Sequence, residues 1–179
     1  MEFQTTHLPG VILIHPRLFK DERGYFMETH HRQRFADADI DVDFVQDNQS
    51  YSHHGVLRGL HYQIHHPQGK LVRCLQGEIF DVAVDLRRSS PNFGKWWGGV
   101  LSSTNRNLVY IPPGFAHGFC VLSEEADVAY KCTDLYSPAD ERTIVWNDPA
   151  VGIEWPISSP LVSAKDQAGL SLTNADCFP

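Results

Sequence analysis

Side chains that could take part in catalysis gather between Gly55 and Gly77 of this 179-residue chain. The stretch contains three histidines, two arginines, a lysine and three glutamines among strand-forming residues. If it lines a cavity, the imidazole of His61 and the ammonium group of Lys70 can point at the same small molecule. A neutral imidazole beside a cation is suited to removing a proton next to a carbonyl and stabilising the negative charge that results.

Two short strands joined by a turn can position these side chains. The two-residue period of a strand over residues 56–64 places His61 on one face and Arg58 on the other. A second strand, over residues 70–75, begins at Lys70 after a turn that contains proline and glycine. The sequence therefore predicts a hairpin that carries both the base and the cation.

The rest of the chain also predicts short strands separated by turns. Further strands are expected over residues 9–20, 25–29, 78–86, 96–102, 108–111, 116–121, 127–134 and 143–146, and one short helix over residues 31–39. Roughly nine short strands with few helices favour an all-β fold, a two-sheet sandwich or jelly-roll barrel, in a single domain spanning residues 1–179. The last ten residues are expected to be loosely ordered.

A run of four amide or acid side chains, from Gln46 to Gln49, interrupts the alternation expected of a simple strand. Such a run forms either a polar loop or the hydrogen-bonding edge of a sheet that faces a ligand. On composition alone, a polar loop is the favoured interpretation.

Alternation orients two further groups. In the strand over residues 127–134, Val128, Tyr130 and Cys132 share one face, so the Tyr130 hydroxyl points inward and needs a partner there. In the strand over residues 78–86, Asp81 falls on the less apolar face.

The overall composition excludes several classes of protein. A formal charge of −7 and a pI near 5.7 argue against binding to nucleic acid or to an anionic membrane surface, since both need a basic field. No window approaches the roughly 20 apolar residues of a membrane span, and the expected location is the cytoplasm. The four cysteines are spread without any Cys-x-x-Cys pair, which favours free thiols over a zinc site or disulfides.

The segment from Pro112 to His117 resembles the second motif of the cupin superfamily. The first cupin motif has two histidines one residue apart, followed by a glutamate, and these residues bind a metal. Here the corresponding positions read His61-Tyr62-Gln63, and Lys70 stands where the glutamate would fall. A cation in place of an acid removes most of a metal's ligand set, so we expect a cupin barrel without metal or other cofactor.

Six separated blocks, in the same order, resemble the dTDP-4-dehydrorhamnose 3,5-epimerase family from about residue 10 to residue 169. The blocks are residues 23–28, 46–48, 58–63, 70–73, 114–119 and 163–166. The resemblance implies an isomerase that inverts C3 and C5 of dTDP-4-dehydro-6-deoxy-glucose, giving dTDP-4-dehydro-L-rhamnose in dTDP-L-rhamnose biosynthesis. It also implies a homodimer whose N-terminal strands reach across, which would give the apolar residues 11–14 a partner sheet.

The resemblance also implies the catalytic roles. His61 is expected to be the general base, hydrogen-bonded to Asp166, and Tyr130 the acid that returns a proton from the opposite face. Lys70, paired with Asp81, is expected to stabilise the enolate oxygen at C4.

The contacts to the nucleotide sugar follow from the same resemblance. They are assigned to Arg23, Glu28, Gln46, Asp47, Asn48, Arg58, Lys70, His117, Glu141 and Lys165, with Tyr136 packing on the sugar. By alternation Arg58 faces away from His61, so either Arg58 precedes the regular strand or Gly59 forms a bulge.

Three other functions fit the residues. A sugar 3-epimerase or 5-epimerase of a related dTDP-4-keto-deoxysugar pathway would use the same groups. A metal-dependent cupin oxygenase and a non-catalytic sugar-binding module are further alternatives. Taken alone, His61 is more often a satisfied strand histidine, and only its combination with Lys70 and Tyr130 favours catalysis.

Overall fold

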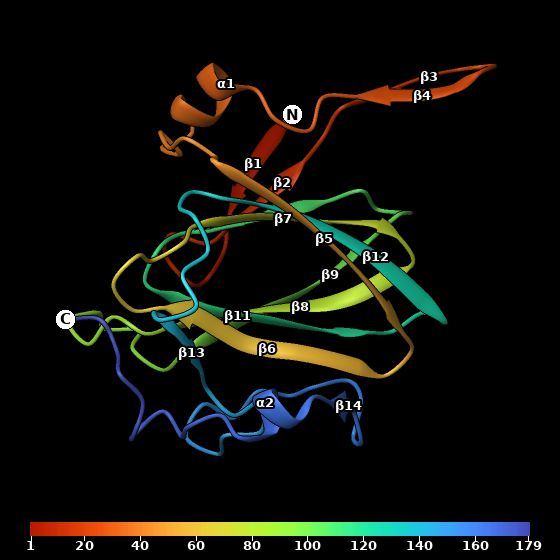
Figure 1. Cartoon of the computed structure of the whole chain (residues 1–179). Coiled ribbons are helices and arrows are strands. Elements are labelled where there is room, and N and C mark those ends of the chain that lie inside the picture. The colour runs from red at the N-terminus through yellow and green to blue at the C-terminus, as the bar shows by residue number, and fades with distance from the viewer.

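Two sheets face each other in the computed structural model, which describes residues 1–179 (Figure 1). The first sheet has the order β1 (Glu2–Thr5), β2 (Ile12–His15), β10 (Leu108–Ile111), β7 (Lys70–Gln76), β12 (Glu125–Cys132) and β5 (Gln46–His53). The second has the order β13 (Glu141–Thr143), β6 (Val56–Gln63), β11 (Phe115–Val121), β8 (Glu78–Asp85) and β9 (Trp96–Ser102), with β14 (Leu161–Val162) alongside β6. The predicted all-β class is confirmed, because the only helices are α1 (Arg32–Ala36) and α2 (Ala164–Gln167).

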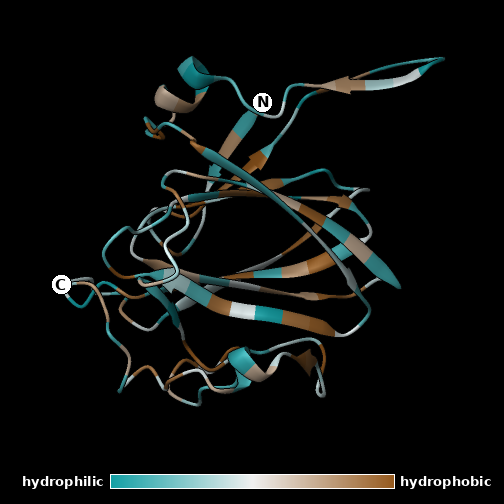
Figure 2. Cartoon of the chain, in the orientation of Figure 1, coloured by the Kyte–Doolittle hydropathy of each residue, from teal (hydrophilic) through white to brown (hydrophobic).

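The main core lies between the two sheets. Val72 and Val128 of the first sheet belong to the same buried cluster as Ile79, Leu101 and Phe119 of the second. Figure 2 shows the hydropathy changing along individual strands, as expected when one face of a strand lies in a core. The inward alternation predicted for Tyr130 is confirmed, since Tyr130 packs against this cluster.

The C-terminal third covers the outer face of the second sheet (Figure 1). Leu172 and Ala175 are buried there against Leu60 and Val84. The Tyr62 hydroxyl donates a hydrogen bond to the Asp176 carbonyl at 2.6 Å. The expectation of a loosely ordered end is therefore wrong, because the sheet has two apolar faces and needs this cover.

The N-terminal segment departs from its prediction. The single strand expected over residues 9–20 is two strands, β2 and β3 (Leu18–Asp21), which are separated at Pro16, where the backbone has no N–H to donate. β3 pairs with β4 (Gly24–Met27) in a hairpin that projects from the body (Figure 1). β2 pairs with β1 and β10, and Val11 and Ile14 are buried within the chain, so these residues do not need a partner sheet.

The run from Gln46 to Gln49 lies in a strand, and the polar-loop interpretation is wrong. β5 pairs with β12 along its whole length and forms the edge of the first sheet. Polar residues suit such an edge, because its outer backbone groups have no strand partner and are best kept in water. The alternative interpretation, a polar sheet edge, is the correct one.

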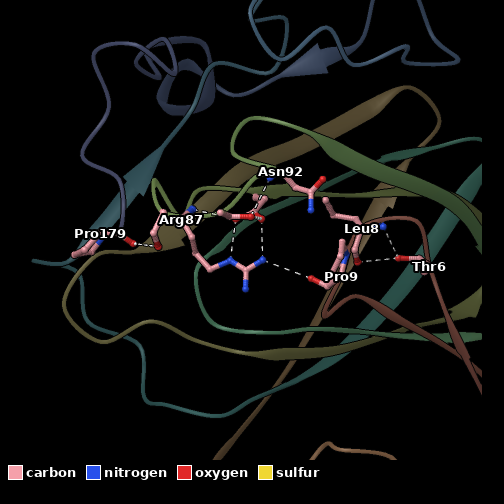
Figure 3. A network of polar contacts seen from close by, with 9 residues as sticks. Thr6, Leu8, Pro9, Arg87, Asn92 and Pro179 are labelled. Carbon is pink, nitrogen blue, oxygen red and sulfur yellow. Dashed lines mark hydrogen bonds and ion pairs between the residues drawn. The ribbon is translucent and has the colours of Figure 1, made fainter.

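A half-buried ion pair, Arg87–Asp85, ties the N-terminal segment to the loop after β8 (Figure 3). The Arg87 guanidinium donates to both carboxylate oxygens of Asp85, at 2.9 and 2.7 Å, and to the Pro9 carbonyl at 3.5 Å. Burial raises the pKa of Asp85, but the hydrogen bonds from Arg87 outweigh it and hold this pKa below its ordinary value. Arg87 also stacks on Phe115 at 4.6 Å, which fixes the start of the strand that carries His117.

All four cysteines are free thiols, as predicted, and three of them are buried. Neither α1 nor α2 could span a lipid bilayer.

Candidate active site

A cavity of about 220 Å³ opens between the two sheets at their polar end. Both sheets contribute to its wall, through β5, β7 and β12 on one side and β6 and β13 on the other. Its lining residues are Gln46, Asn48, His61, Tyr62, Gln63, Gln68, Lys70, Tyr130, Tyr136 and Glu141. The structure thus brings the expected base, cation and phenol to one place.

His61 and Asp166 form the hydrogen bond that the family resemblance implies. The Nε2 atom of His61 lies 2.7 Å from Oδ1 of Asp166, and the Gly59 N–H donates to Oδ2 at 3.2 Å. Ser163 caps the short helix α2 and accepts from the Asp166 N–H, which holds the carboxylate in place. Burial raises the pKa of Asp166, but the hydrogen bonds from His61 and Gly59 outweigh it and keep this pKa below its ordinary value.

A bulge in β6 places Arg58 on the same side as His61. The register with β11 shifts by one residue between the pair His117–His61 and the pair Phe119–Arg58. Gly59 lies here with φ of +122°, and a Cβ atom on it would stand 2.6 Å from the Gly118 Cα. The bulge alternative is confirmed, and Arg58, His61 and Asp166 line one hollow of about 460 Å³.

Lys70 and Tyr130 are neighbours at the cavity wall. The Lys70 Nζ lies 5.8 Å from the centroid of the Tyr130 ring. Burial lowers the pKa of Lys70, an effect that the nearby Cys132, Asp81 and Glu141 partly oppose. Burial also raises the pKa of Tyr130, which keeps the phenol protonated. No protein group accepts a hydrogen bond from the Tyr130 hydroxyl, contrary to the sequence expectation of a partner, so this group is free to act on a ligand.

Asp81 pairs with His117 and does not form the predicted direct pair with Lys70, although its charge still favours the Lys70 ammonium group. The Nε2 atom of His117 lies 2.9 Å from Oδ2 of Asp81, and both side chains are buried. The two residues belong to the neighbouring strands β8 and β11, a relation that alternation within one strand does not reveal. Burial lowers the pKa of His117, although the Asp81 carboxylate opposes this shift. His117 does not reach the wall of the 220 Å³ cavity.

The outer rim of the cavity is held by a chain of polar contacts. The Tyr136 hydroxyl donates to Oε2 of Glu141 at 2.7 Å, and the Lys165 ammonium lies 2.6 Å from the same oxygen. Burial raises the pKa of Glu141, but the hydrogen bonds from Lys165 and Tyr136 outweigh it and keep this pKa below its ordinary value. Asp47 points away from the cavity and pairs with Lys131 at 2.9 Å.

Two predicted contacts do not line the cavity in the single chain. Arg23 is at the tip of the β3–β4 hairpin, where it pairs with Asp21 and is highly exposed. Glu28 follows the hairpin and pairs with Arg34 at 2.9 Å. The chain by itself does not bring either residue to His61.

Comparison with known proteins identifies the family. The sequence model of the dTDP-4-dehydrorhamnose 3,5-epimerase family matches residues 5–174. The chain belongs to the dTDP-4-dehydrorhamnose 3,5-epimerase family. The Pseudomonas aeruginosa enzyme of that name is 56% identical over 96% of both chains, and the Shigella flexneri enzyme is 54% identical over 97% of both. Among solved structures, the Legionella pneumophila epimerase in complex with dTDP-4-keto-L-rhamnose has a TM-score of 0.95 and 48% identity, covering 98% of this chain and 94% of that one.

These comparisons confirm the predicted family, the cupin-type fold and the isomerase activity of a 3,5-epimerase. The epimerase family also has relatives with one reaction centre. A Streptomyces niveus dTDP-4-dehydrorhamnose 3-epimerase is 40% identical over 98% of this chain and 86% of its own length. Membership of the family is therefore compatible with inversion at one centre as well as at two.

The epimerase cavity does not fit a cupin metal. No group of three or more His, Cys, Asp or Glu side chains is arranged to hold a metal ion. Gln63 and Lys70 occupy the positions of two ligands, and an ammonium group repels a metal cation. Gln63 and Gln68 line the cavity but were not among the predicted site residues, although Gln63 shares the predicted face of His61.

Proposed function

We propose that this epimerase inverts both C3 and C5 of dTDP-4-dehydro-6-deoxy-glucose through an enolate, with His61 as the base, Lys70 as the enolate stabiliser and Tyr130 as the acid. The observation that carries the proposal is their arrangement. The His61–Asp166 pair, the ammonium group and a phenol without a protein partner all reach one cavity.

A single base can serve both centres because C3 and C5 flank the same C4 carbonyl. With Nε2 of His61 bonded to Asp166, the other ring nitrogen, Nδ1, is left to take the proton. The carboxylate then stabilises the imidazolium that forms. The Lys70 ammonium supplies the positive charge that favours the enolate oxygen, and its low dielectric surroundings strengthen this effect.

Inversion requires the proton to return from the face opposite the base. His61 lies on β6 in the second sheet, whereas Tyr130 lies on β12 in the first sheet. A sugar between the sheets would therefore have the imidazole on one side and the phenol on the other. The protonated phenol can donate once the enolate raises the local demand for a proton.

The rim residues are proposed to bind the nucleotide sugar. Arg58 and Lys165 line the hollow beside the base and suit the diphosphate, which bidentate or paired cations recognise. Gln46, Asn48 and Glu141 offer hydrogen-bonding groups at the cavity wall, and Tyr136 offers an aromatic face to the sugar. We propose that His117 and Asp81 support the cavity wall behind His61, because His117 lies directly opposite His61 in the register of β11 and β6.

We also propose a homodimer in which each hairpin completes the site of the partner. The hairpin exposes Phe19, Tyr25 and Phe26, an apolar surface that the chain itself does not cover. It also carries Arg23, a predicted substrate contact that does not line the cavity of its own chain. Light scattering should give twice the chain mass, and Phe26→Ser should weaken the dimer while leaving its secondary structure intact.

Two further expectations are retained as proposals. The chain forms one domain, supported by the core cluster that both sheets share. The cytoplasm is the proposed location, supported by four free thiols, which suit a reducing compartment.

The test of the function is the identity of the product. The purified chain should be incubated with dTDP-4-dehydro-6-deoxy-glucose, and the configuration at C3 and C5 determined by proton NMR. Inversion at both centres is the expected result. Inversion at only one centre would favour the single-centre epimerase, the second candidate that the Streptomyces niveus relative supports. An unchanged sugar would refute both.

A further inference from the structure

Four consecutive residues of the loop between β12 and β13 are each hydrogen-bonded to a glutamine side chain. The Nε2 atom of Gln68 donates to the Asp134 carbonyl at 2.8 Å, and the Nε2 atom of Gln63 donates to the Leu135 carbonyl at 3.2 Å. The Tyr136 N–H donates to Oε1 of Gln46 at 2.8 Å. The Ser137 N–H donates to Oε1 of Gln63 at 2.8 Å. The three glutamines come from β5, β6 and the turn before β7, and all three line the catalytic cavity. We call Gln46, Gln63 and Gln68 the glutamine clamp.

Gln63 is the central member of the clamp. Its side chain is buried, at 3% exposure, and its amide also donates to the His66 carbonyl at 2.6 Å. Both amide hydrogens and the amide oxygen are therefore committed to the main chain of two loops. A group so committed has little capacity left to bind a ligand directly, so any effect on the substrate acts through the loops that it holds.

The clamped loop carries Tyr136, which is half-exposed at the cavity wall. The backbone N–H of Tyr136 is held by Gln46, and its hydroxyl is held by Glu141, which Lys165 in turn holds. The aromatic ring is thus fixed at both ends. A loop without regular structure would not keep a ring in one place without such contacts, because ordering it costs conformational entropy.

We propose that the glutamine clamp pre-orders Tyr136 against the sugar and that Gln63 is its principal positioning residue. This inference rests on the proposed epimerase function, since it concerns the sugar of the same substrate. It explains why glutamine stands at a position where a cupin would place a metal ligand: only an amide offers two N–H donors and an oxygen acceptor at the end of a side chain of this length. The clamp acts on binding, because none of its contacts involves the groups that move protons.

The test is steady-state kinetics of Gln63→Met, which keeps the size of the side chain but removes its hydrogen bonds. The KM for the 4-keto nucleotide sugar should rise about tenfold, the effect expected when one or two net hydrogen bonds are lost. The kcat should change by less than about threefold, because the proton-transfer groups are untouched. The acidic limb of the kcat profile should not move. Gln68→Met loses one contact and should raise KM by about threefold, which keeps the test open if Gln63→Met does not fold.

A double-mutant cycle with Tyr136→Ala separates positioning from general destabilisation. If Gln63 acts through Tyr136, Gln63→Met should add no further increase in KM once the ring is absent. Gln76→Met is the matched control, because Gln76 is an exposed glutamine whose side chain hydrogen-bonds only to Glu125, and its KM should equal that of the wild type. An unchanged KM in Gln63→Met, or equal effects with and without the Tyr136 ring, would overturn the clamp. A wild-type chain that leaves the sugar unchanged would instead overturn the proposed function on which it rests.

Discussion

Replacing Asp166 with asparagine tests the base most specifically, because the change keeps the shape of the side chain and removes its charge. The carboxylate accepts two hydrogen bonds, from His61 Nε2 at 2.7 Å and from the Gly59 N–H at 3.2 Å. An amide has only one oxygen to accept with. If that oxygen accepts from the Gly59 N–H, the amide NH₂ donates to Nε2 of His61 and forces the ring proton onto Nδ1, which abolishes the base. If that oxygen accepts from His61 instead, the amide NH₂ faces the Gly59 N–H, and two donors oppose each other.

Either arrangement should lower turnover by about 10²-fold or more, as expected when a carboxylate no longer orients its histidine. That loss corresponds to about 2.7 kcal/mol of transition-state stabilisation. Substrate affinity should change little, because the carboxylate lies behind the imidazole.

The assay is the measurement of kcat, with nucleotide-sugar binding measured by calorimetry. Asp148→Asn is the matched control, since Asp148 is also a buried carboxylate that accepts two backbone N–H groups, from Ala150 and Leu172. It should lower thermal stability without lowering turnover. Normal turnover in Asp166→Asn would refute the role of Asp166 as the partner of the base.

Three further predictions address the remaining groups. Tyr130→Phe should still incorporate solvent deuterium into the sugar next to the carbonyl but fail to complete inversion, because His61 can return the proton that it takes. Mass spectrometry and NMR of the recovered sugar check this prediction, and loss of deuterium exchange would contradict it. Burial lowers the pKa of Lys70 below the ordinary 10.5, so turnover should fall on the alkaline side below pH 10.5, and Lys70→Arg, which stays charged, should shift that limb upward at a lower kcat. Prolonged chelation should leave turnover unchanged, because Gln63 and Lys70 replace metal ligands; activity lost and then restored by zinc, iron or manganese would show the opposite.

Alternation along single strands was sufficient to predict much of the architecture. The strand Trp96–Ser102 has the predicted bounds, and so does Leu108–Ile111. Alternation does not predict a strand that forms only because a neighbouring strand pairs with it. Gln46–His53 is polar on both faces and becomes a strand only because β12 offers a complete ladder of hydrogen bonds.

The site shows the same division. The inward faces of His61, Lys70 and Tyr130 follow from the two-residue period, and these residues do meet at the cavity. The partner of Asp81 depends on which strand lies next to β8, and this information is absent from one strand's pattern. Asp166 is 105 residues from His61 in sequence, and only the family resemblance connected the two.

The direction in which the Arg58 side chain points does not follow from the sequence. Strict alternation turns Arg58 away from the base, and a single extra residue in β6 reverses that orientation. The bulge is possible because Gly59 and Gly118 allow the two backbones to approach closely. Glycine at both positions is compatible with a regular strand as well, so the bulge became certain only in three dimensions.

The central claim is that one base, His61, serves both C3 and C5. Its most direct test is solvent deuterium exchange at each carbon, measured by proton NMR for the wild type and for His61→Ala in deuterated water. The wild type should incorporate deuterium at both carbons. His61→Ala should incorporate none at either, because no enolate forms without the imidazole. Exchange that persists at one carbon in His61→Ala would show that a second base acts there and would contradict the single-base account.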